Sequence, residues 1–221
     1  MNILVAAGPT REYFDSVRFI SNPSSGRMGY ALAREAVRRG HRVTLVTGPV
    51  AIRPPKGVTV IPVVSAAQMA RACKQAFRQA DATFMTAAVC DYRPARRDRH
   101  KIEKKARPWR LLLEPTEDIA AALGRRKGKR LLIAFAMQDR DPRRLAERKL
   151  YDKRCDLIVL NGPENIGSHQ AVVELFTPAQ GWSRPIRGTK TAVARQLVRL
   201  VESMRSGLPD PRRDRPLRSS A

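Results

Sequence analysis

The chain has 221 residues, 43% of them hydrophobic, which is an ordinary share for a globular protein with one substantial core. Forty-three Lys and Arg against 20 Asp and Glu give a net charge of +23, which indicates an anionic partner such as nucleic acid, a membrane surface or a phosphorylated substrate. The three cysteines and three histidines are scattered, so the sequence predicts neither a disulfide framework nor a zinc site. Arginine pairs spread along predicted helices favour a second interpretation, in which most of the excess charge is solvated surface.

Strands and helices alternate through the first 160 residues. Apolar runs predict strands at residues 3–7, 41–47, 58–63, 82–89, 131–136 and 156–160. Helical periodicity predicts helices at residues 27–39, 66–80, 117–123 and 142–153, the first of them ended by Gly40. This βαβ alternation indicates an α/β fold with a Rossmann-like, mostly parallel sheet and helices on both faces. Ligands are then expected at the carboxyl ends of the strands.

The last third of the chain changes pattern. Short apolar segments at 172–176 and 184–187, around the turn region 178–181, predict an antiparallel hairpin at one edge of the sheet, and a helix is expected over 189–204. From residue 206 to 221, Gly, Pro, Arg and Ser dominate, which is typical of a disordered basic tail. We therefore expect one domain over residues 1–205 and a tail over 206–221. No leader and no run of about 18 apolar residues occurs, so a cytoplasmic protein is predicted.

A dense lysine motif is the most informative local feature. Lys101-Ile102-Glu103-Lys104-Lys105 places three ammonium groups within five residues. The surrounding stretch 93–110 is too polar to pack as core, and Pro94 and Pro108 stand near its ends. The motif predicts a mobile, phosphate-gripping basic flap over about residues 92–112.

Two further segments could bind anions. Residues 17–29 contain Ser24-Ser25-Gly26 at the start of a predicted helix, where hydroxyl and N–H groups suit an anion, although either serine could equally be a plain N-cap. Lys149 and Lys153 share one helix face and could bind phosphate, with a solvated helix surface as the alternative. The sequence contains neither a dinucleotide fingerprint nor a P-loop.

These motifs, in this order, resemble the phosphopantothenoylcysteine synthetase (phosphopantothenate–cysteine ligase) family, in its stand-alone bacterial form without a decarboxylase domain. The resemblance covers about residues 2–200 and rests on segments 7–12, 17–29, 87–94, 101–105 and 149–161. It implies a ligase of coenzyme A biosynthesis: 4′-phosphopantothenate reacts with CTP to give an acyl-nucleotidylate and pyrophosphate, and the amine of cysteine then displaces CMP. The resemblance implies CTP as the nucleotide. The sequence alone does not distinguish CTP from ATP, because base selection depends on the geometry of the pocket.

The resemblance also implies site residues. Asn22 and Lys101 are expected to be catalytic, with Asn22 at the substrate carboxylate and Lys101 at the triphosphate. Nucleotide binding is expected from Met85, Thr86, Ala87, Asp91, Lys101, Asp118, Ile119, Phe135, Lys149 and Lys153. Binding of the other substrates is expected from Gly8, Thr10, Asn22, Ser24, Ser25 and Gly26. Mg²⁺ would be held through the nucleotide phosphates. The family further implies a homodimer, with the flap reaching toward the neighbouring protomer, and a possible separate decarboxylase partner.

The sequence departs from the family at three places. At residues 116–119, only Asp118 and Ile119 of the family's Asn-Pro-Asp-Ile remain. After Phe135, Met137-Gln138-Asp139 places a carboxylate one position away from where the family has it. The connection 162–171 is shorter than in the family.

Two alternative functions come from other classes of protein. A nucleic-acid-binding protein with a βαβ core suits the charge but not the 5% aromatic content. A nicotinamide-dependent reductase lacks the fingerprint.

Overall fold

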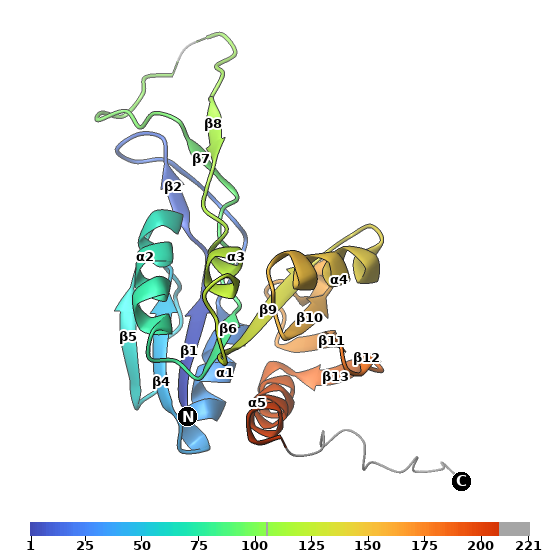
Figure 1. The fold of residues 1–221 in the computed structure, drawn as a ribbon. Helices are drawn as coiled ribbons and strands as arrows, with labels where there is room; N and C mark the ends of the chain where they lie inside the picture. Colours follow the sequence, from blue (N-terminus) through green and yellow to red (C-terminus); the bar gives the residue numbers. More distant parts are fainter. Residues whose placement is uncertain (105, 208–221) are drawn as a thin grey trace.

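A nine-stranded, mostly parallel sheet organises the chain in a computed structural model, which describes residues 1–104 and 106–207 (Figure 1). Its strands are β1 (Asn2–Ala7), β4 (Arg42–Thr47), β5 (Val58–Pro62), β6 (Ala82–Met85), β9 (Leu131–Met137), β10 (Leu157–Asn161), β11 (Gln170–Thr177), β12 (Gly181–Trp182) and β13 (Ile186–Thr189). Their order is β12-β11-β10-β9-β6-β1-β4-β5, with β13 also on β11. The pairs from β5 to β10 are parallel, and those of β11 are antiparallel. The predicted parallel sheet and edge hairpin are therefore confirmed.

Helices cover both faces of this sheet, as predicted. α1 (Arg27–Arg38) and α5 (Lys190–Ser206) pack on one face, and α2 (Ala66–Phe77), α3 (Ile119–Gly124) and α4 (Pro142–Asp152) pack on the other. Successive residues of β1 alternate between the two cores: Ile3 and Val5 face α1 and α5, whereas Leu4 faces α2. Burial on both faces explains why the strands are continuously apolar.

Two small antiparallel pairs, which periodicity did not predict, extend from the carboxyl side of the sheet. β2 (Arg11–Tyr13) pairs with β3 (Phe19–Ser21), and β7 (Tyr92–Pro94) pairs with β8 (Leu113–Pro115). Three-residue strands are too short to show a period in sequence. Residues 95–104 and 106–112, between β7 and β8, belong to the expected flap, which extends away from the sheet (Figure 1).

Three sequence-based expectations need correction. The strand predicted at 82–89 ends at Met85; the next residues still follow β1, because the N–H groups of Thr86 and Ala88 donate to Ala6 and Gly8. Neither Ser24 nor Ser25 is the N-cap of α1: that residue is Gly26, with φ of 72° and no side-chain cap. The helix α2 ends at Phe77 rather than at residue 80.

The C-terminal helix reaches one residue into the predicted tail. α5 ends at Ser206, and the rest of the predicted tail, from residue 208, lies outside the described residues, as does Lys105 of the lysine motif. Within residues 1–104 and 106–207, none of the helices combines the length and the apolar character that crossing a membrane requires.

Candidate functional site

A cavity of about 430 Å³ opens where the parallel strands end. Its wall is assembled from five parts of the chain: the loop and first turn of α1, the segment after β6, the ends of β9 and β10, the connection after β10, and the edge strand with the start of α5. The lining residues are Asn22 to Gly29, Thr86 to Ala88, Asp91, Phe135, Met137, Asn161, Asn165 to Gly167, Ala171, Val173 and Lys190. The site thus lies at the sheet edge that the βαβ pattern predicted.

Two glycines allow α1 to begin against this cavity. Gly26 adopts a left-handed conformation, and a Cβ at Gly29 would come within 2.5 Å of both Ala7 and Thr86. The helix start can therefore pack directly on the ends of β1 and β6. Because no side chain caps it, the N–H groups of Met28 and Gly29 have no hydrogen-bond acceptor among the described residues.

Asn22 is held beside the segment that follows β6. Its side-chain amide donates to the carbonyls of Ala88, at 3.3 Å, and Val89, at 3.0 Å. Beneath it, the buried Thr10 hydroxyl accepts from the N–H of Cys90 at 2.9 Å. The amide nitrogen of Asn22 thus lies at the cavity wall and donates to two carbonyls, and the Thr10 hydroxyl holds the backbone at Cys90.

A cluster of four charged side chains adjoins the cavity through Asp91. The ammonium of Lys153 lies 3.1 Å from a carboxylate oxygen of Asp118, which also caps α3. Burial and the positive charge of Lys153 lower the pKa of Lys149, while the charges of Asp91 and Asp118 act in the opposite direction. These four groups are therefore close enough to interact, and Lys149 and Lys153 share one face as predicted.

Thr116 connects this cluster to the cavity wall. Its N–H donates to the carbonyl of Asp91 at 2.9 Å, and its hydroxyl donates to the carbonyl of Cys90 at 2.6 Å. The residue stands at the first departure from the family's pattern and here positions the chain around Asp91.

The structure gathers eight of the predicted site residues in the cavity lining: Asn22, Ser24, Ser25, Gly26, Thr86, Ala87, Asp91 and Phe135. Asp118, Lys149 and Lys153 form the adjoining charged cluster. Four others are buried behind the wall, with Gly8 and Thr10 under the first loop and Met85 and Ile119 in the core of the α2–α3–α4 face.

Lys101 is exposed and does not line the cavity in the described part of the chain. The flap that carries it is anchored elsewhere: the N–H of Ile102 donates to buried Asp15 at 3.2 Å, and Arg18 donates to the carbonyl of Ile102. Burial acts to raise the pKa of Asp15, but N–H groups of Arg18 and Val17, the Arg18 side chain and Ile102 together hold it well below its ordinary value. Phe14 contacts Trp109 of the flap, with ring centroids 5.5 Å apart.

Sequence reasoning missed four polar residues of the lining: Arg27, Asn161, Asn165 and Lys190. Arg27 directly follows Gly26, so the motif itself could have included it. Lys190 carried no local signal, because only the sheet topology brings it here. β13 is antiparallel to β11, which is antiparallel to β10, so β13 delivers the start of α5 to the carboxyl edge.

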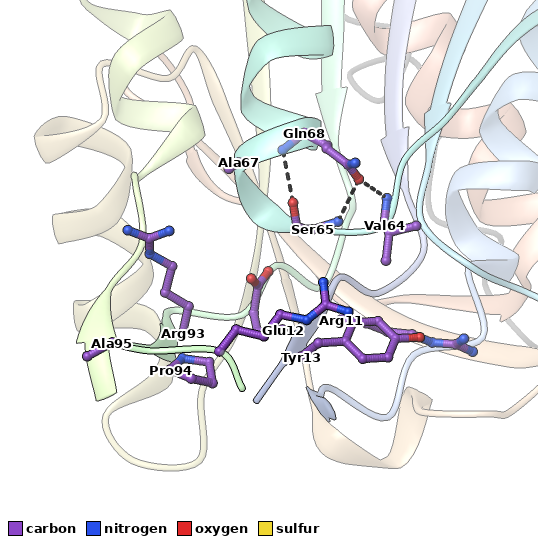
Figure 2. A pocket seen from close by; sticks show the side chains of 11 residues that line it. Arg11, Glu12, Tyr13, Val64, Ser65, Ala67, Gln68, Arg93, Pro94 and Ala95 are labelled. Atoms are coloured by element: carbon purple, nitrogen blue, oxygen red, sulfur yellow. Dashed lines mark hydrogen bonds between the residues drawn. The ribbon is translucent and has the colours of Figure 1, made fainter. Parts of the chain in front are cut away.

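A second cavity, of about 450 Å³, lies between β2, the start of α2 and β7 (Figure 2). Its charged groups already have partners. Buried Glu12 accepts from the N–H of Ala66 at 2.6 Å, Arg93 pairs with Glu114, and Arg11 and Arg97 lie over aromatic rings. None of the predicted site residues is in its described lining, so the first cavity is the candidate site.

Few groups in the described structure could hold a metal directly. Residues 1–104 and 106–207 contain no cluster of three or more His, Cys, Asp or Glu side chains suited to a metal ion. In the lining of the site cavity, Asp91 is the single carboxylate among the described residues.

Comparison with known proteins identifies the family. A family model described as the DNA/pantothenate metabolism flavoprotein C-terminal domain matches residues 1–204. The coenzyme A biosynthesis bifunctional protein CoaBC of Bacillus subtilis (strain 168) is 44% identical over 180 residues, 79% of this chain and 44% of that protein. A protein named cysteine/cysteine sulfinic acid decarboxylase, from an unknown prokaryotic organism, is 46% identical over 168 residues, 75% of this chain and 47% of that protein.

A solved structure agrees with these matches. The crystal structure of the C-terminal domain of a coenzyme A biosynthesis bifunctional protein CoaBC has a TM-score of 0.80 and 38% identity, and the match covers 93% of this chain and 96% of that one. The chain spans about half the length of the curated relatives that it matches. It belongs to the DNA/pantothenate metabolism flavoprotein C-terminal domain family, in agreement with the resemblance seen in its sequence.

Proposed function

We propose that the chain is a phosphopantothenate–cysteine ligase of coenzyme A biosynthesis that uses CTP and forms an acyl-nucleotidylate. One observation carries this proposal. In a member of this family, the cavity at the carboxyl edge of the sheet gathers Asn22, Asp91 and Phe135 from three separate parts of the chain, beside the Lys149–Lys153 cluster.

The first step activates a carboxylate. Without activation, a carboxylate reacts poorly with an amine, because oxide would have to be the leaving group. A carboxylate oxygen of 4′-phosphopantothenate attacks the α-phosphorus of CTP, and the bond to the β-phosphate breaks as pyrophosphate leaves with the electron pair. The Asn22 amide would exchange its carbonyl acceptors, Ala88 and Val89, for the acyl oxygen of substrate and intermediate. In the second step the amine nitrogen of cysteine attacks the acyl carbon, the bond from that carbon to the phosphate oxygen breaks as CMP leaves with the electron pair, and the nitrogen loses a proton to solvent.

Charge has to be balanced throughout the first step, because two anions approach each other. Lys149 and Lys153 would hold the base edge or the phosphates, with Asp91 at the sugar or base and Phe135 packed near the nucleotide. Mg²⁺ fits as an ion held mainly by phosphate oxygens and water, since the described lining offers it only Asp91. When bound, it screens the triphosphate from the incoming carboxylate.

The flap would complete the site by closing. Lys101 and Lys104 of its lysine motif are exposed, and closing the flap would bring Lys101 to the triphosphate and exclude water from a hydrolysable intermediate. Exposed apolar side chains occur on the β2–β3 hairpin, the β7–β8 pair and the flap: Val17, Phe19, Tyr92, Trp109, Leu112 and Leu113. This surface supports a homodimer, which sedimentation analysis would test.

We also propose a cytoplasmic location and a separate decarboxylase that consumes the product.

One assay tests the activity. The pure chain is incubated with 4′-phosphopantothenate, Mg²⁺ and either CTP or ATP, and pyrophosphate is measured with and without cysteine. We expect phosphopantothenate-dependent pyrophosphate release and, with cysteine, formation of phosphopantothenoylcysteine. No release with any nucleotide would refute the proposal.

A further inference from the structure

Two cations meet at the end of the site cavity formed by residues 165–167. Arg27 is the first residue of α1 and Lys190 is the first residue of α5, and both line the cavity. The guanidinium of Arg27 donates to the carbonyl of Gly167, and the ammonium of Lys190 donates to the carbonyl of Asn165 at 2.9 Å. Side chains from opposite ends of the sequence therefore hold the same short loop.

These two cations lack a counter-ion among residues 1–104 and 106–207. In the described part of the chain, neither forms an ion pair with a carboxylate, and their acceptors are neutral carbonyls. Burial lowers the pKa of Lys190, and the positive charge of Arg27 lowers it further. An anion placed between them would relieve this repulsion and accept charge-assisted hydrogen bonds.

The backbone adds donors at the same wall. The N–H groups of Met28 and Gly29, in the uncapped first turn of the twelve-residue helix α1, lie in the cavity lining without an acceptor among the described residues. The positive end of a helix favours an anion there. α5 differs, because the hydroxyl of Thr189 caps it, so that helix contributes its lysine rather than free amides.

We infer that Arg27 and Lys190 form a phosphoryl-binding subsite at this end of the cavity. Its ligand is either the terminal phosphates of the nucleotide or the 4′-phosphate of phosphopantothenate. The identity of these two ligands rests on the proposed function, whereas the binding of a phosphoryl group rests on the two cations and the helix start beside them. On binding, both side chains exchange the carbonyls of residues 165 and 167 for phosphate oxygens.

The test measures binding without turnover. Isothermal titration calorimetry compares the unmodified chain with Arg27→Met and Lys190→Met for pyrophosphate, CTP and 4′-phosphopantothenate, with cytidine and pantothenate as unphosphorylated counterparts. Each substitution should weaken binding of a phosphorylated ligand about 10- to 100-fold and leave its counterpart within about twofold. Weaker binding of pyrophosphate and CTP assigns the nucleotide phosphates, whereas weaker binding of 4′-phosphopantothenate alone assigns its phosphate.

Matched variants separate a local site from general charge. Arg34→Met and Arg199→Met remove the same charge from exposed positions of α1 and α5 and should change every affinity by less than about twofold. Arg27→Lys and Lys190→Arg keep the charge and should recover most of the affinity.

Two results would overturn the subsite. One is that both Met variants, shown by thermal melting to be folded, bind every phosphorylated ligand within about twofold of the unmodified chain. The other is that the unmodified chain binds no phosphorylated ligand more tightly than its counterpart. A third result would refute the proposed function alone: the chain requires Arg27 and Lys190 to bind pyrophosphate, but it forms no phosphopantothenoylcysteine in the assay.

Discussion

The flap and the cavity wall are both basic, but they present their positive charge in opposite ways. In the flap, Lys101 and Lys104 lie close together in sequence, and both are exposed. In and beside the cavity, Arg27, Lys149 and Lys190 come from three different helices, are partly buried, and are positioned by packing or by hydrogen bonds.

The difference indicates a division of roles. Cations fixed in a wall bind an anion without further ordering, whereas cations on an exposed segment lose conformational freedom when they engage. We therefore expect the wall to determine affinity and the flap to determine the rate of the chemical step. Loss of a flap lysine should leave binding and reduce turnover, and loss of a wall cation should do the reverse.

The largest effect is expected from the flap. Lys101→Gln should reduce pyrophosphate release about 1,000-fold, because one cation that stabilises the transition-state charge of phosphoryl transfer is lost. Because Lys101 is exposed, the melting temperature should stay unchanged. Arg99→Gln, also exposed in the flap, is the control and should have little effect. A near-normal rate in Lys101→Gln would show that the flap does not take part in the chemistry.

Asn22 is the exception to this division, because it lies in the cavity wall but we assign it a role in the chemical step. Asn22→Asp should lower kcat about 100-fold, since a second carboxylate would face the carboxylate of the substrate, while the Kd for CTP changes by less than about threefold. Steady-state kinetics and calorimetry measure the two quantities. Asn22→Ala removes the amide without adding charge and shows how much of the loss is repulsion. Equal changes in kcat and Kd would contradict the assignment.

Sequence predicted the parts of the fold and of the site that depend on local pattern. The parallel strands, the five helices and Ser24-Ser25-Gly26 follow from periodicity and from residue types at a helix start. Lys190 did not follow, because its place in the cavity depends on strand pairings that no local pattern encodes. The β2–β3 pair was also missed, since such short strands are stabilised by their tertiary surroundings rather than by their own propensity.

The lysine pair on α4 should affect affinity rather than rate. Lys149→Met should raise the KM for CTP about tenfold and change kcat by less than about threefold, whereas Arg148→Met, on the exposed side of α4, should change neither. The pKa of Lys149 in the unliganded chain is lowered. As the pH rises, Lys149 therefore loses its charged ammonium form, the form that would bind CTP, at a lower pH than an ordinary lysine does. The affinity of the unmodified chain for CTP should therefore fall toward alkaline pH, and Lys149→Met should lack this part of the decline.

The smallest effect on turnover is expected where the flap is anchored. Asp15→Asn weakens the contact with Ile102 and should lower turnover about two- to fivefold, since an unanchored flap closes less often in the productive position. It should also destabilise the fold in a pH-dependent way. The pKa of Asp15 is lower in the folded than in the unfolded chain, so its stabilising contribution is complete above the unfolded value of about 4 and is lost as the pH falls below it.

Guanidinium unfolding at pH 7 and pH 3 measures this contribution. The difference in unfolding midpoint between the unmodified chain and Asp15→Asn should be larger at pH 7 than at pH 3. Asp98→Asn is the control, because Asp98 lies exposed in the flap and its carboxylate accepts, among the described residues, only from the nearby N–H of His100. A midpoint difference that does not depend on pH would mean that the Asp15 side chain acts through its shape rather than its charge. The flap would then be anchored by packing, such as that of Trp109 on Phe14, and not by the buried carboxylate.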